Sequence, residues 1–224
     1  DVGTSMEDLI SINKTTKYVG GIKLETSAPT AKGIFNAINT TYKFLTNKEL
    51  KESTIAISGV GKVGSKLSKL LFERNANLIV SNIGRDAIDQ LKQDKIAFNE
   101  SDINSIFEQK CDIISPCALG GIINLETKKK LKCKAIVGAA NNQLDKSETS
   151  LWLKENNIFY APDYLVNSGG VIAISCEIND SEDTLDDQLN KICDKVLSLL
   201  KESKKSSLST DKIAEDLAWK RINI

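Results

Sequence analysis

The feature that most constrains the fold is a glycine-rich segment that directly follows a short apolar run. Residues 54–58 are typical of a strand buried on both faces, and the pattern Gly59-x-Gly61-x-x-Gly64 follows them without a gap. Apolar residues then recur at helical spacing, and a second strand-like run begins at Leu78. A strand, a glycine turn, a helix and a second strand in this order predict one βαβ unit.

Each glycine has a separate physical role in such a unit. Gly59 permits the sharp turn, Gly61 lets a pyrophosphate approach the backbone, and Gly64 lets the helix pack closely on the strand. Free N–H groups at the helix start then face the phosphates. We therefore predict that this loop binds a nicotinamide dinucleotide on a Rossmann-type domain, and a glycine turn without a ligand is the alternative. The predicted cofactor loop consists of Gly59, Val60, Gly61, Lys62, Val63 and Gly64.

The same alternation continues along the chain. Short runs rich in Ile and Val predict further strands at residues 78–82, 96–98, 113–115, 135–137 and 158–160. Helical spacing predicts helices between them at residues 63–74, 87–93, 103–109, 125–132 and 147–156. This order is typical of an α/β fold with a doubly wound parallel sheet and helices on both faces.

Helices are also predicted on both sides of this region. A long helix at 29–45 leads into the first strand, and an apolar helix at 171–177 follows Gly169 and Gly170. The spacing of apolar residues predicts an amphipathic helix at 185–200. A break at 206–210 precedes a last helix that ends near residue 221. The dinucleotide domain is accordingly predicted to span residues 22–205.

Composition excludes several classes of function. The formal net charge is zero, which gives no electrostatic case for a nucleic-acid or membrane-surface partner. No apolar run reaches the ~20 residues of a membrane span, and the first residues are not expected to act as a signal peptide. The chain has no histidine, so a Ser-His-Asp or Cys-His catalytic unit is impossible within it. Five cysteines without a CxxC pair predict no metal site and reduced thiols in a cytoplasmic protein.

The end of the second strand bears on the choice of cofactor. An acidic residue there normally bonds the adenosine ribose of NAD, but this chain has Asn82. An amide can still bond a ribose, yet it does not repel the 2′-phosphate of NADP. Ser81 and Arg85 could even bind that phosphate, or Arg85 is simply a solvated loop residue. The prediction is therefore NAD by a small margin, with NADP possible.

Several blocks, in order, resemble the leucine dehydrogenase branch of the Glu/Leu/Phe/Val amino-acid dehydrogenases. The similarity covers essentially the whole chain, and the two longest blocks are far more specific than the glycine loop. The blocks are Asp1-Val2-Gly3-Thr4, Ser27-x-x-Thr30-Ala31-x-Gly33, Gly59-Val60-Gly61-x-Val63, Pro116-Cys117-Ala118-Leu119-Gly120-Gly121-Ile122-Ile123-Asn124, Asn142-Gln143-Leu144 and Tyr160-Ala161-Pro162-Asp163-Tyr164-x-x-Asn167-x-Gly169-Gly170-Val171.

The resemblance implies an activity and a quaternary structure. The family interconverts an L-amino acid and its 2-oxo acid plus ammonium, with hydride passing to or from the nicotinamide. A branched-chain or other apolar substrate is implied, and a glutamate-type substrate is the alternative. Members are homo-oligomers.

The resemblance also implies cofactor-binding residues. Ser27 and Thr30 fall where the nicotinamide carboxamide is held. Cys117 and Ala118 lie on the loop beside the adenosine half of the cofactor. Asn167 matches an asparagine near the nicotinamide.

Catalytic and substrate-binding residues are implied in the same way. Asp1 falls on the catalytic aspartate, and Asn142 matches the asparagine that holds the substrate carboxylate and the nicotinamide ribose region. Val171 and Ile174 match two positions that line the pocket for an aliphatic side chain. From the residues alone, both Asn142 and Asn167 follow predicted strands, where parallel sheets bind ligands, or they cap helices and turns. Val171 and Ile174 are alternatively plain core residues.

One part of the family pattern is missing. The two active-site lysines of the family precede the Asp-Val-Gly-Thr block, in a separate N-terminal domain, and this chain begins at Asp1. Without a general base, which typically contributes a factor of ~10²–10⁴, we expect cofactor binding with little turnover. The chain is then a fragment of an enzyme or a naturally shortened protein, and a silent dinucleotide-sensing or assembly module is the rival interpretation. Residues 1–21 would be a remnant of the catalytic domain, and residues 206–224 a helix that returns to it.

Overall fold

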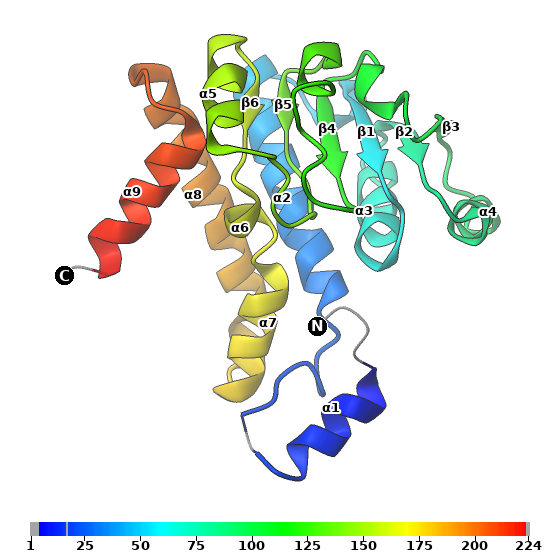
Figure 1. The fold of residues 1–224 in the computed structure, drawn as a ribbon. Coiled ribbons are helices and arrows are strands. Elements are labelled where there is room, and N and C mark those ends of the chain that lie inside the picture. Colours follow the sequence, from blue (N-terminus) through cyan, green and yellow to red (C-terminus); the bar gives the residue numbers. More distant parts are fainter. Residues whose placement is uncertain (1–4, 17, 223–224) are drawn as a thin grey trace.

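The computed structural model describes residues 5–16 and 18–222 and contains one six-stranded parallel sheet (Figure 1). The strands are ordered β3-β2-β1-β4-β5-β6, so the order reverses direction between β1 and β4. This order confirms the predicted doubly wound fold. The strands are β1 Thr54–Ser58, β2 Asn77–Ser81, β3 Asn99–Glu100, β4 Ile113–Pro116, β5 Ala135–Ile136 and β6 Phe159–Tyr160.

The register brings the ends of the three central strands to one edge of the sheet. Ser58 at the end of β1 pairs with Ser81 of β2 and with Pro116 of β4. The first loop residues continue the ladder, because the Gly59 N–H bonds the Ser81 carbonyl and the Cys117 N–H bonds the Ser58 carbonyl, both at 2.8 Å. The loops after β1, β2 and β4 therefore start side by side.

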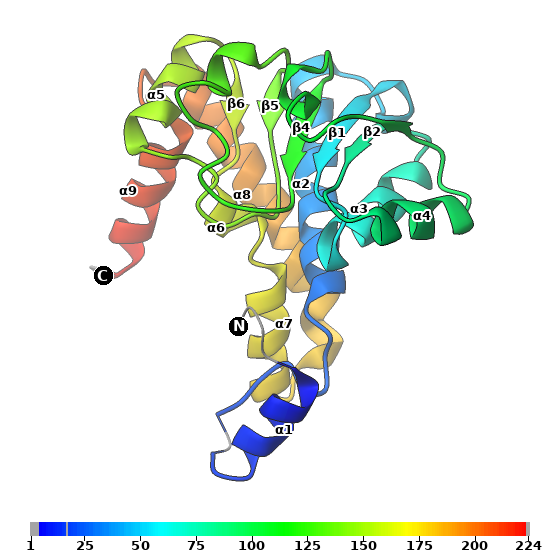
Figure 2. The ribbon, with the colours of Figure 1, turned by 45° about the vertical axis from the view of Figure 1, so that its right-hand side comes forward.

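Helices cover both faces of the sheet, and the period-2 alternation of the strands decides which side chains meet them. Ile55 and Ile57 of β1 pack in the cluster formed with α2, α3, α4 and α8, whereas Ala56 packs on the opposite face with Ile114 and Leu153. The ribbon shows these helices on one side of the sheet (Figure 2). The helices are α1 Met6–Asn13, α2 Ser27–Thr46, α3 Lys62–Phe72, α4 Arg85–Gln93, α5 Ser147–Glu155, α6 Asp163–Val166, α7 Gly169–Ile178, α8 Leu185–Lys205 and α9 Thr210–Ile222.

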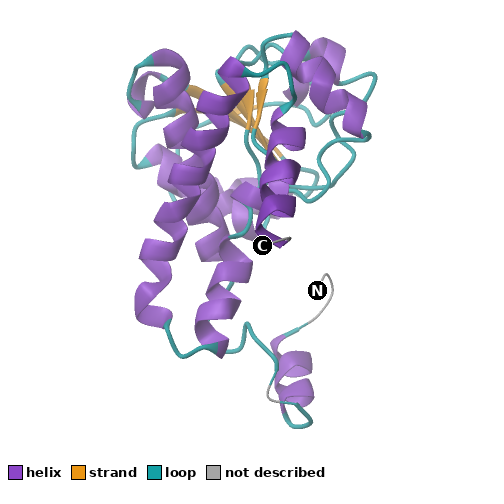
Figure 3. Cartoon of the chain, turned by 90° about the vertical axis from the view of Figure 1, so that its left-hand side faces the viewer, coloured by secondary structure: helices purple, strands orange, loops and turns teal. Residues whose placement is uncertain are grey.

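A group of helices extends past the carboxyl ends of the strands. Helix α7 runs beside α2 and α8 on that side, and α1 lies beyond them, away from the sheet (Figures 1 and 3). Gly169 allows the close approach of α7 to α2, because a Cβ built on it would lie 2.2 Å from the Pro29 carbonyl oxygen. Gly33 of α2 makes room for α8 and α6, because a Cβ there would lie 2.9 Å from Ile192 Cδ1 and 3.3 Å from the Val166 carbonyl oxygen.

Two predicted helices are wrong. Residues 103–109 and 125–132 contain only the three-residue 3₁₀ turns Ile106–Glu108 and Lys128–Lys130. Their apolar spacing reflects loops that lie on the second face of the sheet, where Ile106 is fully buried. In the second loop the Asn124 side chain accepts the N–H groups of Glu126 and Thr127, which is a local alternative to helical bonding.

Two smaller expectations also need correction. The strand predicted at 96–98 lies at Asn99–Glu100, because Lys95 adopts a left-handed conformation (φ 58°) and the pairing with β2 begins only at Asn99. The basic run from Lys128 to Lys130 suggests a solvated helix face, but Lys128 is buried, with Nζ 5.2 Å from the centroid of the Trp152 ring.

Across the described part of the chain, no helix is long and apolar enough to cross a membrane. The same residues contain no group of three or more His, Cys, Asp or Glu side chains arranged to hold a metal ion.

Candidate functional site

Two of the three loop glycines are required by the fold itself. Gly59 has φ +96°, and a Cβ there would lie 2.7 Å from the Ala118 Cβ on the loop after β4. A Cβ on Gly64 would lie 2.0 Å from the Gly59 carbonyl oxygen. Both contacts are closer than packed atoms allow, so neither position accepts a larger residue. The loops after β1 and β4 touch at the point where the strand order reverses.

Gly61 differs, because a Cβ built on it meets no atom within 4 Å. Its φ of −68° is negative, so neither packing nor a left-handed conformation explains the glycine. Gly61 is the N-cap of α3, no side chain caps that helix start, and the first turn contains no acid. Open space beside uncapped N–H groups is the arrangement that accepts an anionic group. A dinucleotide pyrophosphate therefore fits this loop.

The remaining loop residues divide by burial. Val60 is buried in the core, Val63 is half-buried, and Lys62 is exposed. Lys62, the first residue of α3, is therefore the one charged residue of the predicted loop, and it is open to solvent.

Asn82 lies after β2 and is bonded to the glycine loop. Its Oδ1 accepts the Val60 N–H at 3.0 Å, and its Nδ2 donates to the Gly84 carbonyl at 2.7 Å. The amide therefore holds the loop in place beside the end of β2. Its nitrogen could not be replaced by a carboxylate oxygen without losing the bond to Gly84.

The two residues considered for a 2′-phosphate are otherwise engaged. Arg85 at the start of α4 forms an ion pair with Glu100 of β3 and a second, at 3.3 Å, with Asp89. These acids raise the pKa of the Arg85 guanidinium, mainly through the hydrogen bond to Glu100. The Ser81 hydroxyl is buried and has no hydrogen-bond partner among the described residues. Neither group is presented to a phosphate.

The loop after β4 carries the predicted pair Cys117 and Ala118. The Cys117 sulfur lies 3.5 Å from the Ser115 hydroxyl, and burial raises the pKa of the thiol. A neutral thiol on a half-buried residue is a packing group here and is poorly suited to act as a nucleophile. Ala118 is exposed and lies against Gly59, where a larger side chain would enter the loop.

Hydrogen bonds join the loops after β4, β5 and β6. The Asn142 carbonyl accepts the Gly121 N–H at 2.7 Å, and Asn142 itself is exposed with φ 51°. Asn167 donates from Nδ2 to the Asn141 side-chain oxygen at 2.6 Å and to the Ala139 carbonyl at 3.3 Å. Asn142 and Asn167 thus lie at the same sheet edge, and within residues 5–16 and 18–222 the exposed amide of Asn142 forms no hydrogen bond.

Two buried residues, Gln143 and Asp163, hold the loop that carries Asn142 in place. Gln143 donates from Nε2 to the carbonyls of Gly138 and Ala140, and its N–H bonds the Asp163 carboxylate at 2.9 Å. Both side chains are buried. The residue next to Asn142 is therefore fixed, which holds the position of the exposed amide.

The predicted residues of α2 lie at its first turn, next to the start of α7. The Ser27 hydroxyl donates to the Glu25 carboxylate, which also accepts the Ala28 N–H at 3.2 Å. The Thr30 hydroxyl donates to the Thr26 carbonyl at 2.8 Å. A Cβ on Gly170 would lie 2.9 Å from the Thr30 hydroxyl, so the two helix starts are in contact near Asn167.

Val171 and Ile174 occupy different environments on α7. Val171 is 71% exposed, whereas Ile174 is half-buried against Gly20. Both lie on the side of the sheet where the strands end, but the described residues do not enclose Val171. The predicted catalytic residue Asp1 lies outside the described residues.

The sequence reasoning missed Glu177. Its carboxylate accepts four consecutive backbone N–H groups, those of residues 21–24, at 3.0–3.2 Å. Burial raises the pKa of this carboxyl, but the four hydrogen bonds outweigh burial and hold the pKa below its ordinary value. A single acid in the otherwise apolar segment 171–177 was the available signal. Glu177 fixes the segment that leads into α2.

The chain is similar to a known protein family over most of its length. A family model described as Glutamate/Leucine/Phenylalanine/Valine dehydrogenase matches residues 20–84 and 80–222. Phenylalanine dehydrogenase from Thermoactinomyces intermedius is 37% identical over 233 residues, which cover 99% of this chain and 63% of that protein. Leucine dehydrogenase from Bacillus subtilis strain 168 is 40% identical over 185 residues, covering 80% of this chain and 50% of that protein.

Solved structures agree with the sequence comparison. The crystal structure of L-tryptophan dehydrogenase from Nostoc punctiforme superimposes with a TM-score of 0.89 at 31% identity, over 100% of this chain and 66% of that one. The sheet and glycine loop define a Rossmann-type domain. The chain belongs to the Glutamate/Leucine/Phenylalanine/Valine dehydrogenase family, and it spans 50–63% of the length of the two curated relatives described above.

Proposed function

We propose that the chain is the cofactor-binding part of an NAD(P)-dependent amino-acid dehydrogenase. The reaction is the oxidative deamination of a branched-chain or other apolar L-amino acid to its 2-oxo acid and ammonium. The observation that carries the proposal is Gly61, a glycine that the fold does not need, beside an uncapped helix start at the point where the strand order reverses. The names of the leucine and phenylalanine dehydrogenases it resembles support an apolar substrate.

The bound nicotinamide would supply the site that accepts or donates hydride. The chain's own residues bind and orient. N–H groups at the start of α3 face the pyrophosphate, and Ala118 leaves room on the opposite loop. Asn142 offers an amide that can bind a substrate carboxylate without changing its own charge. Ser27, Thr30 and Asn167 would hold the nicotinamide end, and Asp1 would handle the amino group of the substrate.

NAD is the proposed cofactor in preference to NADP. Arg85 is neutralised by Glu100 and Asp89, and the Ser81 hydroxyl is buried, so the residues that would bind a 2′-phosphate are occupied or covered. Asn82 lies at the proposed position of the adenosine ribose, and its side chain holds the glycine loop through the bond from the Val60 N–H. Its amide carries no charge that would exclude NADP outright.

The domain assignment follows from the same proposal. Residues 22–205 form the dinucleotide domain, while residues 1–21 and 206–224 belong to a catalytic domain that completes the cleft. The first turns of α9 pack on this domain through Ile213 and Ala214. Its later residues Leu217, Trp219 and Ile222 are 43–70% exposed, as expected of a surface that another domain covers. The complete protein is proposed to be a homo-oligomer.

The test uses the complete protein and the 224-residue chain in parallel. The complete protein should reduce NAD in the presence of Leu, Val, Ile or Phe and much less with Glu, while the chain alone should bind NAD with little turnover. Dinucleotide binding by both without activity on any amino acid would instead support a silent sensing module. Activity with Glu alone would contradict the apolar substrate.

A further inference from the structure

Two amide side chains meet at the carboxyl edge of the sheet, on the loops after β5 and β6. Asn167 donates from Nδ2 to the Asn141 Oδ1 at 2.6 Å and to the Ala139 carbonyl at 3.3 Å. Asn141 is not among the residues that the sequence predicted for the site, which included its neighbour Asn142. Asn141 is exposed and Asn167 is half-buried, so both residues retain contact with solvent.

The bonding partners fix which way the Asn167 amide is turned. A backbone carbonyl can only accept, so the atom that faces Ala139 must be the N–H2 nitrogen. The same nitrogen faces Asn141, whose side chain must then present its oxygen. Both hydrogens of the Asn167 amide are thereby used. Its oxygen Oδ1 accepts no hydrogen bond within residues 5–16 and 18–222, and it is the atom left for a ligand.

The backbone of Asn141 is itself held by the loop after β4. A Cβ built on Gly120 would lie 2.4 Å from the Asn141 carbonyl oxygen, so the two loops are packed directly on each other at this point. The Gly121 N–H bonds the Asn142 carbonyl at 2.7 Å, one residue further along. The backbone that carries the Asn141 side chain is therefore fixed on the side away from Asn167.

The position of this pair along the sheet indicates which half of a dinucleotide lies over it. The strand order reverses between β1 and β4, and a dinucleotide binds across that point with its adenosine half on the side of β2. The other half then lies over the loops after β4, β5 and β6, which include Asn141 and Asn167. In NAD this half carries the nicotinamide, whose carboxamide N–H2 group donates and cannot accept. The ribose hydroxyls both donate and accept, so they do not require an acceptor of fixed orientation.

We propose that Asn141 is a positioning residue for the cofactor, because it holds the Asn167 amide so that the Asn167 Oδ1 accepts the carboxamide N–H2 group of the nicotinamide. This inference rests on the proposed function, since it needs a nicotinamide dinucleotide at this sheet edge. Asn141 acts through Asn167. Without Asn141, the Asn167 amide keeps only the longer bond to Ala139 and is free to turn, which would set its N–H2 group against that of the carboxamide.

The test compares three dinucleotides by calorimetric titration into the 224-residue chain. In 3-acetylpyridine adenine dinucleotide a methyl group replaces the amide nitrogen, whereas thionicotinamide adenine dinucleotide keeps the N–H2 group and has sulfur in place of the oxygen. The acetylpyridine dinucleotide should bind at least about threefold more weakly than NAD, because one hydrogen bond is lost. The thionicotinamide dinucleotide should bind within about twofold of NAD. Equal binding of NAD and the acetylpyridine dinucleotide, or equal weakening of both analogues, would overturn the inference.

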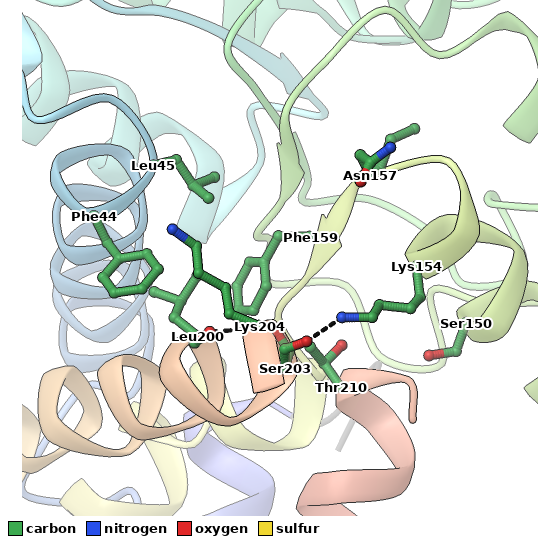
Figure 4. A pocket seen from close by; sticks show the side chains of 11 residues that line it. Phe44, Leu45, Ser150, Lys154, Asn157, Phe159, Leu200, Ser203, Lys204 and Thr210 are labelled. Atoms are coloured by element: carbon green, nitrogen blue, oxygen red, sulfur yellow. Dashed lines mark hydrogen bonds between the residues drawn. The ribbon is translucent and has the colours of Figure 1, made fainter. Parts of the chain in front are cut away.

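Four variants test the role of Asn141. Asn141→Ala and Asn167→Ala should each reduce the preference for NAD over the acetylpyridine dinucleotide to less than about twofold. Asn141→Asp should restore the preference, because a carboxylate still accepts the Asn167 N–H2 group. The control is Asn157→Gly, which should keep the parent preference: Asn157 lines a pocket at the amino end of β6 (Figure 4), and its φ of 58° suits glycine. A parent-like preference in Asn141→Ala would contradict the role of Asn141.

The ratio of affinities separates this inference from the proposed function on which it rests. If the chain binds none of the three dinucleotides, the proposed function fails and the inference fails with it. If the chain binds all three with equal affinity, the proposed dinucleotide site stands and only the role of Asn141 and Asn167 is overturned.

Discussion

The side-chain oxygen of Asn82 accepts the backbone N–H of Val60 at 3.0 Å, which joins the end of β2 to the glycine loop. Asn82, which stands where the cofactor ribose is expected to bind, therefore also holds the glycine loop that is predicted to bind the phosphates. An aspartate here would keep the acceptor for Val60 and add a negative charge. It would lose the bond from the amide nitrogen to Gly84.

Asn82→Asp should therefore raise the preference for NAD over NADP by at least about tenfold, because a carboxylate repels the 2′-phosphate. Calorimetric titration of both dinucleotides measures the ratio. Asn82→Ala is the control: it removes the bond to Val60 and should weaken both dinucleotides alike. An unchanged ratio in Asn82→Asp would mean that Asn82 does not face the ribose.

Arg85 gives a second prediction about cofactor choice. Glu100 is the main acid that engages the guanidinium, so Glu100→Gln should leave it held by Asp89 alone and increase NADP affinity several-fold relative to NAD. Lys130 forms an exposed ion pair with Glu108 at 2.9 Å, and Glu108→Gln serves as a matched control that should leave both affinities unchanged. If NADP binding does not improve in Glu100→Gln, Arg85 does not reach the 2′-phosphate even when Glu100 no longer holds it.

Glu177→Gln should lower the free energy of unfolding by about 1.5–3 kcal/mol, because an amide nitrogen would replace one oxygen that accepts N–H groups of residues 21–24. Glu155, an exposed residue at the end of α5, provides the control, and Glu155→Gln should change the stability by less than about 0.5 kcal/mol. Denaturant unfolding of the three proteins measures the difference.

The same carboxylate predicts a pH dependence. The pKa of Glu177 is lower in the folded state than in the unfolded chain, so its contribution is complete above the unfolded value of about 4.3 and is lost as the pH falls through the folded value. The gap in stability between the parent chain and Glu177→Gln should hence be constant near neutral pH and shrink in acid. A gap that grew with acidity would have the wrong sign.

Gly64→Ala tests the packing role of the third loop glycine. Its Cβ would meet the Gly59 carbonyl oxygen at 2.0 Å, so we expect a loss of about 1–3 kcal/mol or more in unfolding free energy. The contact involves two backbone segments, and neither can move without disturbing β1 or α3. Stability equal to that of the parent chain would show that the loop is looser than described.

The sequence predicted the sheet well where burial dominates. Strands β1, β2 and β4 are continuous apolar runs in the middle of the sheet, and tertiary packing and local preference agree there. Residues 103–109 and 125–132 were misassigned as helices because apolar spacing records burial, and a loop pressed on a sheet also buries apolar residues.

The sequence predicted where the candidate site lies, but it predicted only some of the contacts within the site. A motif shows that Asn82 and Arg85 follow β2, but not that their partners are Val60 and Glu100. The four hydrogen bonds to Glu177 join segments more than 150 residues apart in the chain, and no local pattern encodes such a contact. Polar contacts between residues far apart in the chain could therefore not be predicted from the sequence.

The central claim is that the glycine loop binds a dinucleotide, and Gly61 tests it most directly because the fold does not need that glycine. Calorimetric titration of NAD into the 224-residue chain should show one saturable site. Gly61→Ala should keep the stability of the parent within about 1 kcal/mol and weaken NAD by at least about tenfold, because its Cβ fills the space of the pyrophosphate. A stable Gly61→Ala variant that binds NAD as tightly as the parent would contradict the claim.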